Sequence, residues 1–200
     1  MNVYVVYCHP RPQSFTNAAL QRTIAGLQRG GHDVRITDLY GDGFAPELSR
    51  EEWAARAQFA PAFPPLPDDL VASAELLRWC EALVMVYPTW WSGQPGMLKG
   101  WVDRVLAPGV AYTYQEGTTQ VAPMLTNIKR LVAVTTHGSS KLVNSLQGEP
   151  GKRTLTRAIR SMCSRRCRTT WVALYGIDRA SEERRTKFLD RVERTMAALR

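Results

Sequence analysis

The chain has 200 residues, of which 44% are hydrophobic and 22% are charged. These proportions are ordinary for a soluble globular domain, and the length suffices for one sizeable core but is marginal for two. No apolar run approaches the roughly 20 residues of a membrane-spanning helix, so the composition excludes a membrane-spanning protein. The formal net charge is +8, and residues 101–200 carry 18 of the 26 Lys and Arg residues.

The N-terminus and the cysteines bear on where the protein works. The segment from Met1 to Tyr7 has neither the basic region nor the small-residue cleavage site of a signal peptide, and it is typical of a first strand. The four cysteines do not suggest a disulfide framework. Cys163 and Cys167 stand four residues apart on a predicted helix, but no His or further Cys is close by, so we expect no metal site. We expect a cytoplasmic protein.

The first part of the chain predicts two strands, a helix between them and a long excursion. The first helix stops at Gly30-Gly31, which is a good helix end. The excursion from Phe44 to Pro67 is rich in Pro, Ala and Phe and is predicted to hold one short helix and then irregular chain. In chain order, the predicted elements are a strand over Val3–Cys8, a helix over Asn17–Leu27, a strand over Asp33–Leu39 and a helix near Arg50–Phe59.

The rest of the chain alternates helices with three further apolar strands. Acidic residues Asp68 and Asp69 open the next helix, where they suit the positive end of the helix dipole. Five apolar strands separated by helices predict a single α/β domain over residues 1–200, built on one doubly wound parallel sheet. The predicted elements are a helix over Asp68–Trp79, a strand over Ala82–Val86, a helix over Pro95–Leu106, a strand over Leu131–Thr136, a helix over Thr154–Ser164, a strand over Thr169–Tyr175 and a helix over Ser181–Leu199.

Three predicted loops follow the first, third and fourth strands. In an open α/β sheet, ligands bind at the carboxyl ends of the strands, so these loops form the candidate site. In the first loop, Ser14, Thr16 and the first amides of the helix would direct donors to one point, which favours a bound phosphate. A plain N-cap by Ser14 or Thr16 is equally consistent with that loop.

The second loop contains Trp90 and Trp91, and a water-facing turn has no structural need for two adjacent tryptophans. Large aromatic faces at the carboxyl end of a buried strand suit a flat ring ligand, while the alternative is that both rings fill a core or an interface. The third loop is small and polar. Together the three loops predict a phosphate seat, an aromatic wall and a polar rim. The candidates in the last two loops are Pro88, Thr89, Trp90, Trp91, Ser92, Thr135, Thr136, His137 and Gly138.

The basic segment 152–168 is consistent with a solvated helix face, an acidic partner or a nucleotide phosphate. No helix-turn-helix, zinc-finger or RNP-type pattern accompanies the charge, so we expect no nucleic-acid partner. Two nucleotide-binding motifs are incomplete. Leu146 stands where a Walker A loop around Gly151-Lys152 needs its first glycine, and Gly41-Asp42-Gly43 lacks the third glycine of a dinucleotide fingerprint.

Several of these segments resemble the NAD(P)H:quinone oxidoreductase family of flavodoxin-like fold, in its shorter bacterial form. The resemblance covers residues 2 to about 178 and is strong in the first 140. It implies a three-layer sandwich with strand order 2-1-3-4-5 and helices on both faces. It rests on His9 with Ser14-Phe15, on Asp38-Leu39-Tyr40 with Phe44, Pro46 and Ser49-Arg50, on Pro88 to Val105 with Leu98-Lys99-Gly100-Trp101 as its most specific element, on Ala111-Tyr112-Thr113-Tyr114 and on Thr135-Thr136.

The resemblance implies a tightly bound flavin, hydride transfer from NADPH or NADH to it, and transfer onward to a quinone-type acceptor. It also implies a homodimer with the site at the subunit interface, and His137 is the candidate catalytic residue. By position, the flavin phosphate and ribityl end would be held by His9, Ser14, Phe15, Thr16 and Asn17, the isoalloxazine lined by Thr89, Trp90, Trp91 and Ser92, and its polar edge contacted by Thr135, Thr136, His137 and Gly138.

Two departures from the family pattern matter. Mammalian-type members have a Tyr and a His just after the third loop, where this chain has Asn144 and Pro150. The segment from Gly41 to Trp79 is shorter than in those members and leaves less material for an adenine shelf, so we expect FMN, with FAD as the alternative. Some relatives are ancillary subunits of potassium-efflux transporters. The alternative function is therefore a flavin-binding regulatory subunit in peripheral contact with such a transporter.

Overall fold

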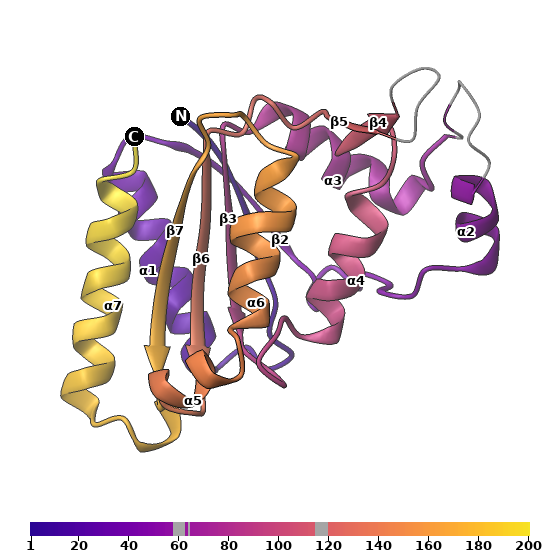
Figure 1. The fold of residues 1–200 in the computed structure, drawn as a ribbon. Helices are drawn as coiled ribbons and strands as arrows, with labels where there is room; N and C mark the ends of the chain where they lie inside the picture. Colours follow the sequence, from indigo (N-terminus) through magenta and orange to yellow (C-terminus); the bar gives the residue numbers. More distant parts are fainter. Residues whose placement is uncertain (58–62, 64, 115–119) are drawn as a thin grey trace.

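The computed structural model describes residues 1–57, 63, 65–114 and 120–200 of the chain. Its main sheet has five parallel strands in the order β2-β1-β3-β6-β7 (Figure 1). A separate antiparallel pair, β4 (Tyr112–Tyr114) and β5 (Val121–Pro123), lies beyond the end of α4. The strands of the main sheet are β1 (Asn2–Tyr7), β2 (Asp33–Asp38), β3 (Ala82–Pro88), β6 (Arg130–His137) and β7 (Arg168–Tyr175).

Helices cover both faces of this sheet (Figure 1), which confirms the three-layer sandwich and the strand order that the sequence predicted. One face is covered by α1 (Phe15–Arg29) and α7 (Glu182–Ala197), and the other by α3 (Asp68–Trp79), α4 (Gly96–Val105) and α6 (Pro150–Arg153) with the π-helix Thr154–Ile159 that continues it. The shorter elements are α2 (Arg50–Ala57), α5 (Lys141–Leu146) and a 3₁₀ turn at Ile177–Arg179. Within the described ranges, no helix combines the length and apolar character needed to cross a bilayer.

The alternation of side chains along each strand divides the core into two layers. In β1, Val3 and Val5 pack with α1 and α7, whereas Tyr4 and Val6 pack with α3 and α4, and all four are fully buried. β3 is buried over its whole length. Because β1, β3 and β6 have a neighbour on each side and helices above and below, these strands are near-continuous apolar runs.

The sequence prediction was wrong in detail between β6 and β7. The predicted helix over 154–164 begins earlier, at Pro150, and proline suits the first helical turn because its missing N–H is not needed there. The sequence also gave no sign of α5, since Leu142 and Leu146 are 70% and 80% exposed and no apolar stripe faces the core. The strands β4 and β5 were not predicted from the sequence, because three residues are too few to show the alternation of apolar and polar side chains. The predicted helix over 50–59 is observed over Arg50–Ala57, and its last two residues lie outside the described ranges.

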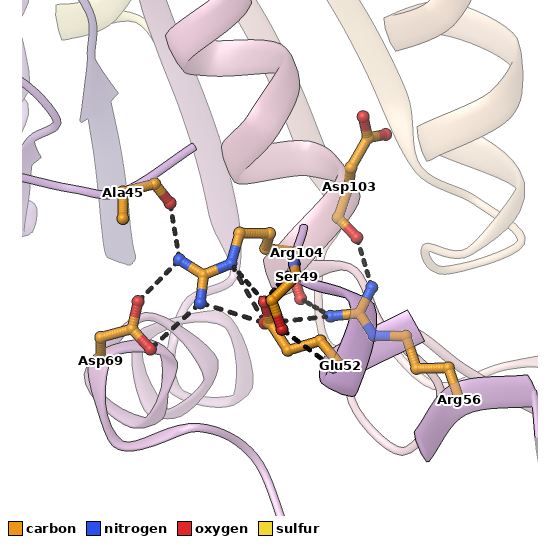
Figure 2. Close-up of polar contacts among 7 residues, drawn as sticks. All are labelled: Ala45, Ser49, Glu52, Arg56, Asp69, Asp103 and Arg104. Atoms are coloured by element: carbon orange, nitrogen blue, oxygen red, sulfur yellow. Dashed lines mark hydrogen bonds and ion pairs between the residues drawn. The ribbon is translucent and has the colours of Figure 1, made fainter. Parts of the chain in front are cut away.

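A buried ion cluster fixes the excursion between β2 and β3 onto α4. The guanidinium of Arg104 on α4, only 5% exposed, contacts the carboxylates of Asp69 on α3 (2.7 Å) and Glu52 on α2 (3.0 Å), as well as the carbonyl oxygen of Ala45 (2.6 Å; Figure 2). Arg56 donates to the carbonyl oxygens of Asp103 and Arg104 itself, which satisfies the end of α4. Three helices are thereby joined at one charge that would be costly to leave unpaired.

Two further contacts hold the same excursion. Ser49 and Glu52 form a capping box at the start of α2, because the Ser49 hydroxyl accepts from the Glu52 amide and the Glu52 carboxylate accepts from the Ser49 amide. On α4, a Cβ at Gly100 would lie 2.3 Å from the carbonyl oxygen of Pro46, so only glycine admits this chain crossing. Trp101 beside it is fully buried and its indole N–H donates to the Ser73 hydroxyl. The most specific element of the resemblance is therefore a packing element.

Gly100→Ala should lower the free energy of unfolding by roughly 3 kcal/mol, because the new methyl group meets backbone atoms that cannot rotate away. Gly96→Ala on the same helix is the matched control, since a Cβ there has open space and alanine favours the helix by up to about 1 kcal/mol. Urea unfolding of both variants checks this. Equal losses at the two positions would contradict the crowding of Gly100 against Pro46.

Candidate functional site

The first loop ends at the amino terminus of α1, which has free donors. Ser14 is the N-cap, and its hydroxyl accepts from the amide of Asn17 (3.0 Å). Within the described part of the chain, the amides of Phe15 and Thr16 have no acceptor. Unpaired amides at the positive end of a 15-residue helix are suited to bind an anion. Ser14 is thus the N-cap that the simpler interpretation of this loop predicted, and it stands directly before the two amides that have no acceptor.

The side chains of this loop divide into two groups. The ring of Phe15 packs against Phe188 of α7, with the ring centroids 5.9 Å apart, so only its backbone faces the loop. Thr16 is buried, and Asn17 is partly exposed. Nδ1 of His9 lies 3.0 Å from the amide nitrogen and 3.1 Å from the carbonyl oxygen of Arg11, so the loop itself engages this ring nitrogen. Partial burial lowers the pKa of His9, which favours the neutral form of the ring.

The second loop is a tight turn held in a strained conformation. The amide of Trp90 donates to the carbonyl of Gly93 (3.1 Å), and the amide of Gly93 donates back (3.0 Å). The two central residues, Trp91 and Ser92, have φ values of 50° and 60°, a region where glycine and asparagine are usual. Each costs about 1–2 kcal/mol in this conformation. Strain of this kind clusters at functional sites, where the surrounding structure imposes it.

The turn holds its indole rings out into solvent. Trp91 is 102% exposed and Trp90 is 42% exposed, so neither ring fills the core of this chain. The surrounding contacts immobilise the turn. The carbonyl of Ser92 accepts from the amide of Gly151 (3.1 Å), and the Ser92 hydroxyl donates to the side-chain carbonyl of Gln147. Two strained residues and an exposed aromatic surface are therefore fixed against the α5–α6 segment at the carboxyl edge of the sheet (Figure 1).

The candidates of the third loop belong largely to the strands. Thr135, Thr136 and His137 are the last residues of β6, and Pro88 is the last of β3, whereas the sequence placed Pro88 and His137 in loops. The cause is the register, which pairs Pro88 with Thr136 and so extends both strands. The Thr89 amide donates to the carbonyl of Thr136 (2.7 Å), and the hydroxyls of Thr89 and Thr135 lie 3.0 Å apart. The second and third loops therefore meet at the edge of the sheet.

His137 is a buried support for this edge. It is 5% exposed, and its Nδ1 lies 2.8 Å from Oδ1 of Asn144, whose amide group donates to the carbonyls of Ser139 and Ser140. Because Oδ1 must then accept, Nδ1 of His137 carries the proton and Nε2 is left to accept from the Thr89 hydroxyl (3.4 Å). Burial lowers the pKa of His137, which keeps the ring neutral near pH 7.

Sequence reasoning missed a group of residues that complete this region. Tyr175 stacks on His137 with ring centroids 4.5 Å apart, because β6 and β7 place the two residues opposite each other in register. The Tyr175 hydroxyl donates to Glu149 (3.2 Å), and Lys152 pairs with the other carboxylate oxygen (2.9 Å). The Lys152 ammonium holds the pKa of Glu149 below its usual value. A signal existed for Tyr175 alone, since it closes a predicted strand at the ligand edge.

Asn144 and the Gly148–Gly151 segment also acquire clear roles. Asn144 orients His137, and Gly151 lies so close to the turn that its Cβ would be 3.2 Å from the carbonyl oxygen of Ser92. The carbonyl of Gly151 accepts from the Gln94 side chain (2.9 Å). The incomplete Walker-like segment is therefore a support for the Trp90–Gly93 turn. A cavity of about 460 Å³ between α2, Phe63 and the end of α4 contains no residue of the three loops.

The φ value of 50° at Trp91 makes a prediction for the ligand-free protein. The free energy of unfolding of Trp91→Gly should be about 1 kcal/mol higher than that of Trp91→Ala, because glycine enters the left-handed region without the cost that alanine has there. At Trp90, whose φ is not positive, the same pair should show the reverse order. Denaturant unfolding of the four variants measures both differences. The same order at both positions would rule out backbone strain as the cause.

The lowered pKa of His137 predicts a pH dependence of stability. The unfolded chain binds more protons than the folded one below about pH 6.5, so the free energy of unfolding should fall as the pH drops from about 7.5 to 5.5. His137→Gln should flatten this slope, whereas Tyr175→Phe, which keeps both rings, should retain it. Thermal melts at several pH values test the difference. An unchanged slope in His137→Gln would assign the effect to the other histidines.

Several known proteins are similar to this chain. A family model described as flavodoxin-like fold matches residues 1–199. NAD(P)H dehydrogenase [quinone] 1 of Rattus norvegicus is 31% identical over 159 residues, which covers 74% of this chain and 57% of that protein. An uncharacterized NAD(P)H oxidoreductase of Haemophilus influenzae is 34% identical over 118 residues, covering 58% of this chain and 56% of that protein. The chain thus spans about half the length of the curated relatives that it matches.

Solved structures of similar size match the chain over its whole length. The NAD(P)H:quinone oxidoreductase of Methanothermobacter marburgensis superimposes with a TM-score of 0.86 at 29% identity, covering 100% of this chain and 99% of that one. Smu.1420 of Streptococcus mutans superimposes with a TM-score of 0.85 at 26% identity, covering both chains completely. The resemblance to NAD(P)H:quinone oxidoreductases is confirmed, and the chain belongs to the flavodoxin-like fold family.

Proposed function

We propose that this protein is a flavin-dependent NAD(P)H oxidoreductase that reduces quinones or similar acceptors. The observation that carries the proposal is the strained Trp90–Gly93 turn, which holds Trp91 fully exposed at the same edge of the sheet as the free amides of α1. An anion seat and an exposed aromatic surface at one edge fit a phosphate-bearing, planar cofactor. Relatives named as NAD(P)H dehydrogenase [quinone] and NAD(P)H oxidoreductase support the same reading.

Each loop would contribute a different contact. The amides of Phe15 and Thr16, with Ser14, Asn17 and His9, would hold the phosphate and ribityl end. Thr89, Trp90, Trp91 and Ser92, which follow Pro88, would line the ring, and Thr135, Thr136 and Gly138 would face its polar edge. The flavin, when bound, supplies the hydride chemistry, and the chain supplies orientation, exclusion of water and polar contacts.

His137 acts as a positioning residue in this proposal. Both of its ring nitrogens are engaged by protein groups, its pKa is lowered and its ring is stacked on Tyr175, so it is held neutral and does not have a free proton to deliver. Its role is to orient the Thr89 hydroxyl beside Thr135. Because the Thr89 hydroxyl gives its proton to Nε2 of His137, the Thr135 hydroxyl is the member of this pair that can donate to a charge that develops on the cofactor.

The cofactor that we propose is FMN, with FAD as the alternative, and the hydride donor is NADPH or NADH. A solved FMN-dependent NADH-azoreductase of Bacillus anthracis shares the fold at 14% identity, with a TM-score of 0.69. The phosphate seat at α1 accounts for the single phosphate of FMN. The cytoplasmic location expected from the sequence belongs to this proposal. The relatives give no support to the alternative role as a subunit of a potassium-efflux transporter.

A homodimer fits the exposed surface beside the site. Trp91, Leu142 and Leu146 are 102%, 70% and 80% exposed; both leucines belong to α5, and the Ser92–Gln147 hydrogen bond joins the Trp90–Gly93 turn to the end of that helix. Exposed apolar side chains of this size gather where a partner covers them. A second copy seated on α5 and the Trp90–Gly93 turn would enclose the cofactor ring between subunits.

The proposal is tested by the ligand and by turnover. Protein saturated with flavin should oxidise NADPH or NADH with menadione as acceptor, and it should give parallel double-reciprocal lines because one stacking surface serves both substrates in turn. Mass spectrometry of the ligand released by heat should show the mass of FMN. If the protein carries no bound flavin even after FMN or FAD is added and the unbound flavin is removed, the proposal is refuted. A released mass that includes adenine would change only the identity of the cofactor.

Trp91→Ala should weaken flavin binding by roughly 1–3 kcal/mol, the scale of losing one aromatic wall. Trp53→Ala is the matched control, because Trp53 is 64% exposed on α2 and belongs to none of the three loops. Fluorescence titration of the two apoproteins with FMN gives both dissociation constants. Unchanged affinity in Trp91→Ala would place that ring in the subunit interface only.

A further inference from the structure

A groove lined by five arginines lies at the opposite edge of the sheet from the candidate site. It opens between the amino ends of β6 and β7 and the last turns of α7, and its volume is about 770 Å³. Figure 1 shows the end of α7 beside the start of β7, far from α5. Among the residues that the structure describes, no acidic side chain lines this groove. Its lining residues are Arg130, Arg168, Thr170, Arg191, Arg194, Thr195, Ala198, Leu199 and Arg200.

None of these five guanidinium groups has a carboxylate partner in the described part of the chain. Arg130, Arg191 and Arg194 donate only to the neutral carbonyls of Lys129, Ala173 and Asp190. Three acidic side chains of α7, Glu183, Asp190 and Glu193, form ion pairs with residues that do not line the groove. Glu193 pairs with Arg22 and Arg29 of α1, on the other side of the helix. The five arginines of the groove therefore form no ion pair within the described part of the chain, although Arg194 also borders a neighbouring pocket that Asp190 and Glu193 line.

The sheet itself forces two of these charges together. Arg130 and Arg168 are paired in register on neighbouring parallel strands. Both project on the α7 side, because Val132 and Val172, two and four residues further along their strands, pack in the core layer under α7. Like charges at such neighbouring positions destabilise a sheet. An anion between them would remove this repulsion, and the hydroxyls of Thr170 and Thr195 add polar contacts in the same groove.

We propose that this groove binds phosphate groups. Guanidinium groups present several N–H donors in a plane, which match the oxygens of a phosphate, and a set of five suits a ligand with more than one negative charge. The site is separate from the phosphate seat at α1. The eight residues of β7 span about 25 Å at about 3.3 Å per residue, so one phosphate cannot serve both edges. The free phosphate of a metabolite and the headgroup of an anionic lipid share this chemistry.

The test measures the binding of pyrophosphate to the protein by isothermal titration calorimetry at low ionic strength. Wild-type protein should bind it, and the double variant Arg130→Gln with Arg168→Gln should bind at least ten-fold more weakly. The matched control, Arg157→Gln with Arg166→Gln, removes the same charge at two exposed positions outside the groove and should bind within two-fold of wild type. In chloride buffer, the groove variant should melt at or above the wild-type temperature, because a repulsion has been removed.

Vesicles of phosphatidylcholine with and without phosphatidylglycerol distinguish the two phosphate sources. Binding to anionic vesicles that only the groove variant loses would assign the groove to lipid headgroups, and loss of pyrophosphate binding alone would assign it to free phosphate compounds. Binding of neither probe, equal loss in the groove and control variants, or full binding by the groove variant would each overturn the proposal. If the double variant fails to fold, Arg194→Gln alone should still weaken pyrophosphate binding several-fold.

Discussion

The site depends on the common direction of the strands in the central sheet. β1, β3, β6 and β7 run parallel, and their register brings Tyr7 beside Val86, Pro88 beside Thr136 and His137 beside Tyr175. Every connection that leaves a carboxyl end therefore emerges at the same edge. Residues that are far apart in the sequence meet there because the strands are buried and cannot slip by one residue without moving their apolar side chains to the wrong face.

That edge is held rigid by contacts that do not touch a ligand. The Trp90–Gly93 turn keeps two residues in the left-handed region, and the amide of Gly151 and the Gln147 side chain hold it there. Asn144 fixes the tautomer of His137, and Tyr175 supports its ring. An asparagine thus orients a buried histidine, and the phenol that supports the histidine ring comes from the end of β7.

The arginines of this protein occur in two very different surroundings. At α4, Arg104 is buried and its charge is balanced by Asp69 and Glu52, so it joins helices. At the amino edge, the arginines of β6, β7 and α7 lie in an open groove and form no ion pair with any carboxylate that the structure describes. The same residue type thus has opposite consequences, because a buried guanidinium requires acceptors from the protein whereas an exposed cluster is available to an external anion.

The sequence by itself determined the fold class, the five strands of the main sheet and the three candidate loops. Apolar runs such as Ala82–Val86 indicate a strand buried on both sides. Ser14 indicates a helix start, because serine is a favoured N-cap residue. Only the tertiary structure decided what depends on neighbours in space: that Gly100 lies under Pro46, that Phe15 turns its ring toward Phe188, and that Tyr175 stacks on His137. Local patterns carry propensity and period, whereas contacts between distant segments depend on register and packing, which no single stretch of sequence contains.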